Sequence, residues 1–434
     1  MRIPKQTERY ATRSLILGSV LLLAAGSTMA QASGQPVTPM APPLLVLADA
    51  PQETFHDSEL SPCGGIKVHI DSPVRAFQDQ RGIVHLLTAD PSGRAWQWTG
   101  RPGEFNDHPT GAVLDCEPVM LGDVGNDDVT AFDQKTFVQA LHFDLLGQRV
   151  HGYGHQDYFA TRFSDPDCHR SGVVDGKPQC WYSSIVAWDA DTSGPDAHLD
   201  FNKSASTPDH GAIYPHVPYP GDSATPTAGW IGYGTPSNIV RGFGDDGAPD
   251  GYYYLFAYTS SGYGAQDKGI CLFRSDDPTD HTRWRAWNGD AINSAFTQAM
   301  GNPYLTQTGP CVVVNPGTFK SYVRSVVWHA SSRHYIAVFR DTNGVRYATS
   351  RDLLTWNPSA PLLTSNTTQV NYPVIVDLAA GFPLFAGDDP NFDSVYGMGK
   401  TYLYFRTSVA WGHTRINRQR LDVANYTPVP AEAR

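Results

Sequence analysis

The sequence predicts an all-β protein, a five-bladed β-propeller with four-stranded antiparallel blades. Short aromatic and β-branched runs alternate with turns rich in Gly, Asp and Pro along most of the chain, and such runs are typical of strands. The runs also group into five similar units, which begin near residues 71, 132, 236, 321 and 370. Repetition of a four-strand unit is typical of a propeller. A β-sandwich shows the same alternation of strands and turns and is the alternative fold.

The clearest unit lies between residues 236 and 290. Its predicted strands are 237–241, 251–259, 269–275 and 284–287. The unit that begins near 321 repeats this plan with predicted strands at 321–328, 334–340, 344–350 and 355–356. Closely spaced strands of this kind form an antiparallel meander, which is the structure of one blade.

The remaining units are less regular. The predicted strands of the first, second and fifth units are 74–77 and 83–88; 132–143, 149–153 and 181–188; and 370–377, 400–407 and 416–421. Residues 158–179 and 189–235 are expected to be long loops. We predict one propeller domain over 61–427, preceded by a linker or N-terminal arm at 31–60. Residues 40–65 could add a strand that closes the ring.

Residues 1–30 have the pattern of a signal peptide. Arg2, Lys5, Arg9 and Arg13 precede an apolar run at 15–25, and a small residue, Ala30, ends the segment. Cleavage after Ala30 would leave 434 − 30 = 404 residues. We therefore expect a secreted or periplasmic protein, with a retained membrane anchor as the alternative. No later segment has the ~20 consecutive apolar residues that a membrane span needs.

The composition excludes some partners and indicates an oxidising compartment. The formal net charge is −11, so the chain lacks the basic field that nucleic-acid binding needs. All six cysteines follow Ala30, which suggests three disulfides. Six cysteines allow 15 pairings; we expect the sequential one, Cys63 with Cys116, Cys168 with Cys180 and Cys271 with Cys311. Metal binding is the weaker alternative, since no CxxC or HxxxH spacing lies near a cysteine.

Several motifs resemble those of known propeller glycosidases. Asp71-Ser72-Pro73-Val74-Arg75, an Asp-x-x-Gly turn and His85-Leu86-Leu87 are similar to the first blade of the family 43 arabinanases and xylosidases and the invertase-like family 32. Residues 236–241 followed by 250–255, and residues 347–356, resemble further blade motifs of that group. The resemblance covers most of 71–421 as repeated motifs. The chain also resembles secreted bacterial propeller proteins of unassigned activity, which implies no activity.

The candidate catalytic residues are carboxylates near first-strand starts, because the groups at one end of a propeller's channel bind its ligands. Asp71 lies where the resembled enzymes keep their general base, although Ser72 separates it from Pro73. A carboxylate there could activate water or attack the anomeric carbon, or cap a turn. The resembled enzymes use a glutamate as acid, for which Glu117 is the candidate. We prefer Asp157, if burial raises its pKa. Asp133 would orient the others, unless it is a solvated turn residue.

The candidate substrate-binding residues include three arginines at matched places in first strands, Arg75, Arg241 and Arg324. Converging arginines bind carboxylates, as sialidases do with acidic sugars; alternatively, each pairs with an aspartate of an adjacent blade. The other candidates are His155, Asn238 and Tyr372. No cofactor is expected. The acidic loop of Asp245, Asp246 and Asp250 offers oxygens for a structural Ca²⁺, although a plain turn is favoured.

These patterns together predict a monomeric, exported glycoside hydrolase that acts on a poly- or oligosaccharide with paired carboxylates at the propeller axis. A non-catalytic glycan-binding propeller is the first alternative. A sialidase-like or lyase enzyme for acidic sugars is the second, and it predicts that three arginines converge on one point.

Overall fold

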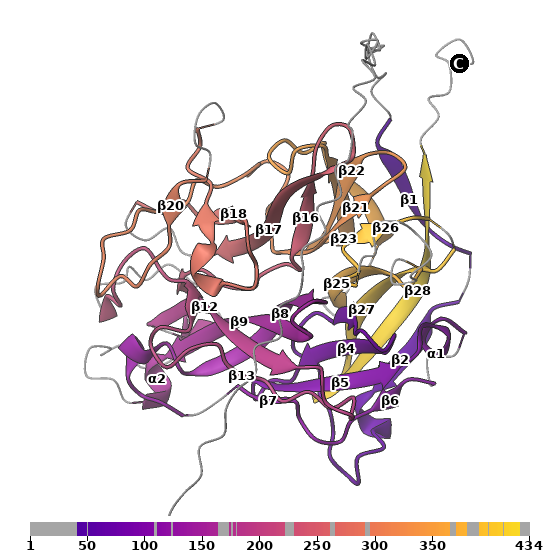
Figure 1. The fold of residues 1–434 in the computed structure, drawn as a ribbon, viewed down its shortest axis with the longest axis horizontal. Helices are drawn as coiled ribbons and strands as arrows, with labels where there is room; N and C mark the ends of the chain where they lie inside the picture. The colour runs from indigo at the N-terminus through magenta and orange to yellow at the C-terminus, as the bar shows by residue number, and fades with distance from the viewer. Residues whose placement is uncertain are drawn as a thin grey trace, which may run out of the picture. The chain divides into compact units, whose positions relative to one another are not determined.

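The computed structural model describes residues 41–49, 51–107, 111–122, 125–163, 173–174, 177–178, 180–221, 230–260, 265–290, 296–364, 370–379, 390–397, 399–410 and 412–425. These residues belong to one compact unit, Met40–Arg434. They confirm the five-bladed propeller, in which five antiparallel sheets form the blades (Figure 1). The predicted signal peptide lies outside the described residues.

The blades follow the chain in order, and we number them 1 to 5. Blade 1 contains β3 (Arg75–Gln78), β4 (Val84–Ala89), β5 (Arg94–Gly100), β6 (Val113–Leu114) and β7 (Met120–Leu121). Blade 2 contains β8 (Lys135–Asp144), β9 (Arg149–Phe159), β12 (Trp181–Asp191), β13 (Asn202–Lys203), β14 (Gly211–Ile213) and β15 (Ile231–Gly232). The last three strands lie in a segment expected to be a loop. They are short additions at the edge of β12.

Blades 3 and 4 match the predicted meanders most closely. Blade 3 contains β16 (Val240–Phe243), β17 (Pro249–Thr259), β18 (Gly269–Ser275), β19 (Arg285–Ala286) and β20 (Gln298–Ala299). Blade 4 contains β21 (Val323–His329), β22 (His334–Asp341), β23 (Gly344–Ser350), β24 (Ala360–Thr364) and β26 (Ser394–Val395). Its outer strand begins later than expected, because Trp356 forms only an isolated bridge to Ser350.

Blade 5 joins the two ends of the described chain. It contains β25 (Val370–Asp377), β27 (Thr401–Ala410), β28 (His413–Asn425), β1 (Pro43–Leu47) and β2 (Glu53–Asp57). The indigo β1 lies beside the yellow β28 in Figure 1, and β2 pairs with the same strand. Residues 43–57 therefore belong to the propeller and close its ring, and the domain begins earlier than the expected boundary at residue 61.

The elements outside the blades are short. They are the helices α1 (Pro102–Asp107) and α2 (Ala160–Phe163), the hairpin of β10 (Val173–Val174) and β11 (Lys177–Pro178), and the 3₁₀ turns η1 (Ser58–Leu60), η2 (Val129–Ala131) and η4 (His281–Arg283). No helix in the described part of the chain is long and apolar enough to span a membrane.

The hydrophobic core consists of five clusters, one between each pair of neighbouring blades. Successive side chains of a strand point to opposite faces of the sheet. On β17, Tyr254 and Phe256 accordingly pack in the cluster shared with blade 4, whereas Leu255 and Ala257 pack in the cluster shared with blade 2. Both faces of a blade are buried, and this is why the strand sequences are almost continuously apolar.

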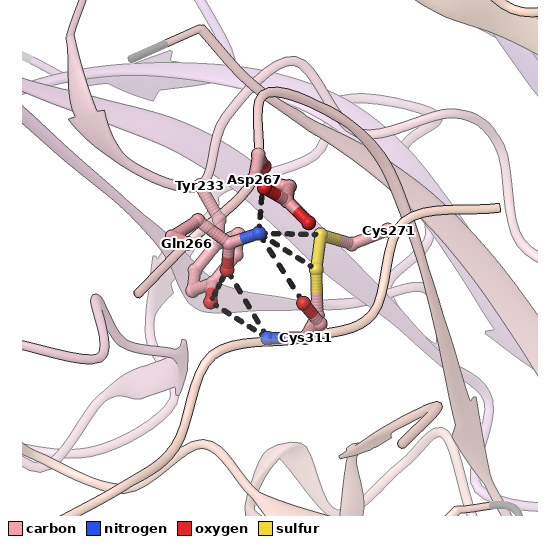
Figure 2. Close-up of a disulfide and its surroundings, with 5 residues drawn as sticks. All are labelled: Tyr233, Gln266, Asp267, Cys271 and Cys311. Atoms are coloured by element: carbon pink, nitrogen blue, oxygen red, sulfur yellow. Dashed lines mark hydrogen bonds between the residues drawn. A yellow bond between two sulfur atoms is a disulfide. The ribbon is translucent and has the colours of Figure 1, made fainter. Parts of the chain in front are cut away.

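Two of the disulfides of the sequential pairing lie within the described residues, Cys63–Cys116 and Cys271–Cys311. Cys180 is also disulfide-bonded, and its expected partner, Cys168, lies outside the described residues. Figure 2 shows the second bond, in which Cys271 of β18 is joined to the segment after β20.

A small hydrogen-bond network holds the Cys271–Cys311 bond in place (Figure 2). Gln266 Oε1 accepts hydrogen bonds from Tyr233 Oη at 2.6 Å and from Cys311 N at 3.1 Å, and its amide nitrogen donates to the Cys311 carbonyl at 3.3 Å. The bond and its network therefore fasten the segment after β20 to β18 and to Tyr233, which lies in the connection that leads into blade 3.

The segment 390–395 crosses the C-terminal ends of the innermost strands. Its oxygens accept hydrogen bonds from the backbone N–H groups of Gln78, Phe143, Arg241 and Trp328 at 2.7, 2.6, 2.8 and 2.8 Å. These donors belong to blades 1, 2, 3 and 4, so the segment links four blades at one end of the central channel.

Candidate active site

A pocket of about 320 Å³ lies at the N-terminal ends of the innermost strands. Its described lining comes from all five blades or from the connections that lead into them: Asp71, Lys135, Phe137, Gln139, His155, Asp157, Phe159, Trp181, Trp230, Thr235, Tyr322, Arg324, Asn371 and Tyr372. Five of these had been predicted as site residues, namely Asp71, His155, Asp157, Arg324 and Tyr372. First-strand starts, which were expected to carry the functional groups, thus supply most of this lining.

Three of the innermost strands carry a β-bulge at the pocket. The pairing of β8 with β9 skips Gln139, and that of β21 with β22 skips Arg324. On β25, the register shifts between Asn371 and Val374, so Tyr372 is skipped as well. A bulge leaves a residue outside the ladder and turns its side chain in a new direction. Gln139, Arg324 and Tyr372 all line the pocket as a result.

The backbone is strained at two lining residues. Thr235 and Tyr372 have φ values of 50° and 55°, in the left-handed region that β-branched and bulky residues avoid. Such conformations cost roughly 1–3 kcal/mol each and cluster at functional sites. Their occurrence on one pocket therefore supports its assignment as the functional site.

Asp71 is held by groups from blade 5. Tyr372 Oη donates a hydrogen bond to Asp71 Oδ1 at 3.0 Å, and Arg406 Nη1 lies 3.7 Å from the same oxygen. Burial raises the pKa of Asp71, while Arg406, Tyr372 and Lys135 oppose this shift because they stabilise the carboxylate. A raised pKa brings the proton affinity of this carboxylate closer to that required of a general base near neutral pH.

Asp157 lies at the end of β9, in contact with β12. Its Oδ1 accepts hydrogen bonds from Trp181 Nε1 and Ser183 Oγ, both at 2.7 Å. His155 Nε2 lies 2.8 Å from the same oxygen. The side chains of His155 and Asp157 are each 5% exposed. The two residues share a strand face because they are two positions apart, and both reach the pocket.

Aromatic rings form one wall of the pocket. The Trp181 and Trp230 rings have centroids 4.8 Å apart, and Trp230 stacks on Tyr322 at 5.8 Å with an interplanar angle of 8°. Phe159 packs against Trp181 at 5.1 Å. Flat aromatic surfaces of this kind suit the apolar faces of sugar rings.

The three predicted arginines do not converge. Arg75 donates only to backbone carbonyls, those of Val74, Gln139, Pro236 and Arg324. Arg241 pairs with Asp393 at the opposite end of the channel, at 3.1 Å. Only Arg324 lines the pocket. The convergence of three arginines, which the acidic-sugar alternative predicted, is therefore wrong, and each arginine has a different environment. Pairing with an aspartate of another segment, the other possibility, is found for Arg241 alone among the three.

The structure places the other predicted residues away from this pocket. Asn238 exchanges hydrogen bonds with the Val326 backbone, Nδ2 donating and Oδ1 accepting, both at 2.7 Å, and so connects blades 3 and 4. Asp133 pairs with Lys203 at 2.5 Å. Glu117 is exposed in the turn after β6. None of the three is among the described lining residues.

The acidic loop forms ordinary turn contacts. Asp246 accepts from the backbone N–H of Ala248 at 2.9 Å, and Asp250 accepts from that of Tyr252 at 2.8 Å. Asp245 lies 3.2 Å from Arg351. Within the described ranges, no group of three or more His, Cys, Asp or Glu side chains is arranged to hold a metal ion.

The sequence did not single out Lys135, Gln139, Trp181, Tyr322 or Asn371 as site residues. Lys135, Tyr322 and Asn371 lie at the starts of first strands, and that position in the sequence could have identified them. Gln139 reaches the pocket through a bulge, and Trp181 through the pairing of β12 with β9. Neither is visible in a single sequence.

Comparison with solved structures finds other proteins of similar fold. A family 117 glycoside hydrolase from Zobellia galactanivorans is 12% identical with a TM-score of 0.45, over 89% of this chain and 93% of that one. An exo-β-1,3-galactanase from Phanerochaete chrysosporium is 8% identical with a TM-score of 0.43, over 87% and 64%. A Dyadobacter fermentans protein of unknown function is 12% identical with a TM-score of 0.41, over 82% and 97%.

These similarities concern the fold alone. No protein-family model matches the sequence, and no curated protein matches it. The functional argument therefore depends on the pocket itself.

Proposed function

We propose that the protein is an exported glycoside hydrolase whose active site is the pocket between Asp71 and Asp157. The observation that supports this most is that two carboxyl groups from different blades, 86 positions apart in the sequence, line one sugar-sized pocket. Glycosidases of most families cleave the glycosidic bond between two such groups. The aromatic wall of Trp181, Trp230 and Tyr322 provides a surface on which a sugar ring could stack.

Asp71 would be the base or the nucleophile. As a base, its carboxylate takes a proton from water while the water oxygen bonds to the anomeric carbon and the glycosidic C–O bond breaks. The leaving oxygen must then receive a proton from the other side of the bond. As a nucleophile, Asp71 would form the bond to the anomeric carbon itself, and water would break it in a second step.

The proton donor would be Asp157. His155 Nε2 lies 2.8 Å from Asp157 Oδ1 but makes no hydrogen bond within the described residues. Asp157 would release a proton to the leaving oxygen and regain one from the water that takes part in the reaction. Trp181 and Ser183 hold the Asp157 carboxyl in a fixed orientation.

A substrate screen with matched variants tests the proposal. The purified protein is incubated with plant, algal and bacterial polysaccharides, and the products are separated and identified. We expect hydrolysis of at least one polysaccharide, with kcat reduced about 10³-fold or more in Asp71→Asn and Asp157→Asn, since each variant removes an essential proton-transfer or nucleophilic group. Asp133→Asn serves as the control, because Asp133 lies outside the pocket.

Two outcomes would contradict the proposal. Turnover retained in Asp71→Asn would exclude Asp71 from the chemistry. Binding of a polysaccharide without any product, in a wild-type protein that is folded by circular dichroism, would instead support a non-catalytic glycan-binding propeller.

A further inference from the structure

The pocket contains a buried cation that forms no ion pair within the described residues. Arg324 is 4% exposed and lines the pocket. Its Nη1 has no hydrogen-bond partner in the part of the chain that the structure describes. The guanidinium lies between two aromatic rings, 4.4 Å from the Tyr322 centroid and 4.8 Å from that of Tyr372. The two rings flank the guanidinium, and Arg324 is one of the residues that line the pocket.

This arrangement is costly without a ligand. A buried charge is ordinarily paired, because the protein must replace the hydration that the charge has lost. Burial lowers the pKa of Arg324 for this reason. Arg75, equally buried, shows the usual solution, since it donates to four carbonyls. Arg324 has no such set, so an anion in the pocket would supply what is missing.

A second cation lines the same pocket. Lys135, at the start of β8, forms no ion pair within the described residues, and its ammonium group lies 5.0 Å from the Phe137 ring centroid. The electrostatic influence of both Lys135 and Arg324 reaches Asp71. Arg406 lies 3.7 Å from Asp71 and offsets its charge. The cations Lys135 and Arg324 thus balance the carboxylates of Asp71 and Asp157 in the pocket lining, and Arg406 adds a third positive charge beside Asp71.

We propose that the pocket selects acidic sugars and binds the carboxylate of a uronic acid residue through Arg324, with Lys135 as a second cation. This inference rests on the proposed function in taking a sugar as the ligand. A planar guanidinium matches a planar carboxylate, which can accept two parallel hydrogen bonds. One arginine and one lysine would do the binding, rather than the three arginines of the acidic-sugar alternative.

Paired sugars test the inference directly. Affinities are measured by titration calorimetry for galacturonate against galactose, glucuronate against glucose, and mannuronate against mannose, each pair differing only at C6. We expect at least one uronate to bind about 10- to 100-fold more tightly than its neutral partner, as a charge-assisted hydrogen bond would give. Galactose 6-sulfate is included as the tetrahedral anion.

The variants separate this site from general charge effects. Arg324→Met should remove the preference for the uronate. Arg324→Lys should retain only part of this preference, because the positive charge remains while the two parallel N–H donors of the guanidinium are lost. Lys67→Met is the control, since Lys67 is an exposed residue paired with Glu59 and its loss changes the net charge equally. Thermal unfolding monitored by circular dichroism establishes that each variant is folded.

Each outcome decides the question. Equal binding of uronates and neutral sugars, no uronate binding at all, or an unchanged preference in Arg324→Met would overturn the inference. Tighter binding of the sulfate would overturn the choice of a carboxylate. Uronate binding that depends on Arg324, without hydrolysis of any polysaccharide, would sustain the inference and refute the hydrolase; hydrolysis of a neutral glycan only would do the reverse.

Discussion

Arg75 and Arg324 allow a sharp comparison, because two equally buried arginines are expected to differ in their effect on stability. They are 3% and 4% exposed, and both lie at the start of an innermost strand. Arg75 donates to backbone carbonyls of four blades, at 3.0 Å to Val74, 3.4 Å to Pro236 and 2.8 Å to Arg324, and also to Gln139. The guanidinium of Arg324 makes no hydrogen bond to the described residues. We therefore compare two variants, Arg75→Met and Arg324→Met.

The free energy of unfolding that Arg75→Met is expected to lose comes from the carbonyl oxygens that no longer have a hydrogen-bond donor. Gln139 and Arg324 lie at bulges, so their strand ladders offer no substitute donor. A buried carbonyl without a donor costs ~1–3 kcal/mol, which gives roughly 2–6 kcal/mol for these two. Relief of the desolvation of the guanidinium offsets part of this cost, so we expect about 2–4 kcal/mol. Arg324→Met loses only cation–π contacts and should change the free energy of unfolding by about 1 kcal/mol or less.

The assay is urea unfolding at pH 7, followed by tryptophan fluorescence and circular dichroism. Domains are stable by only ~5–15 kcal/mol, so the difference between the variants is large enough to measure. The reasoning would be refuted if the two variants lost the same free energy of unfolding, or if Arg75→Met changed it by less than about 0.5 kcal/mol, as a surface substitution does.

The remaining predictions concern the pocket and the acid stability. In Tyr372→Phe, Asp71 loses a hydrogen bond that lowers its pKa, so the acid limb of the pH profile of kcat/KM should move to higher pH; an unchanged limb would argue against Asp71 as the base. In Gly234→Ala, the new Cβ would lie 2.3 Å from His155 Nε2 and would displace the imidazole ring. We therefore expect kcat to fall by about 10- to 100-fold. Activity within about twofold of wild type would exclude a role for the position of that ring. Burial lowers the pKa of His142 to about 4. The unfolded chain takes up a proton at this residue below pH ~6.5, so the free energy of unfolding falls between pH 6.5 and pH 4. His142→Gln should therefore reduce the loss of unfolding free energy from pH 7 to pH 5 by about 2 kcal/mol. An equal loss in both proteins on urea unfolding would contradict this.

The fold was largely predictable because its signals are local. Turn residues bound each strand, and β-branched and aromatic residues mark its length, so strands such as β18 and β23 were predicted with the bounds that the structure has. The repeat of these units indicated the propeller, and the pairing of β1 and β2 with β28 accords with the expected closing strand.

Part of the candidate site was predictable for a similar reason. Asp71 precedes the first strand of blade 1 and Asp157 lies near the end of β9, and the geometry of a propeller brings these strand ends towards a common axis. The sequence thus indicated the carboxylates that share the pocket, although it offered Asp133 and Glu117 as well. Their partners, Lys203 for Asp133 and solvent for Glu117, depend on how distant segments pack.

By itself, the sequence determined the strands, their grouping into blades and the positions of charged residues along each strand, because propensity and periodicity act over a few residues. Only the tertiary structure decided what those charges do. Arg75, Arg241 and Arg324 occupy matched places in the sequence, yet one joins blades through carbonyls, one pairs with Asp393 and one faces the pocket. The physical reason for the place of Arg324 is a bulge that leaves it outside its ladder, whereas Arg75 and Arg241 are paired in theirs, and a shift of one residue turns a side chain to the other face.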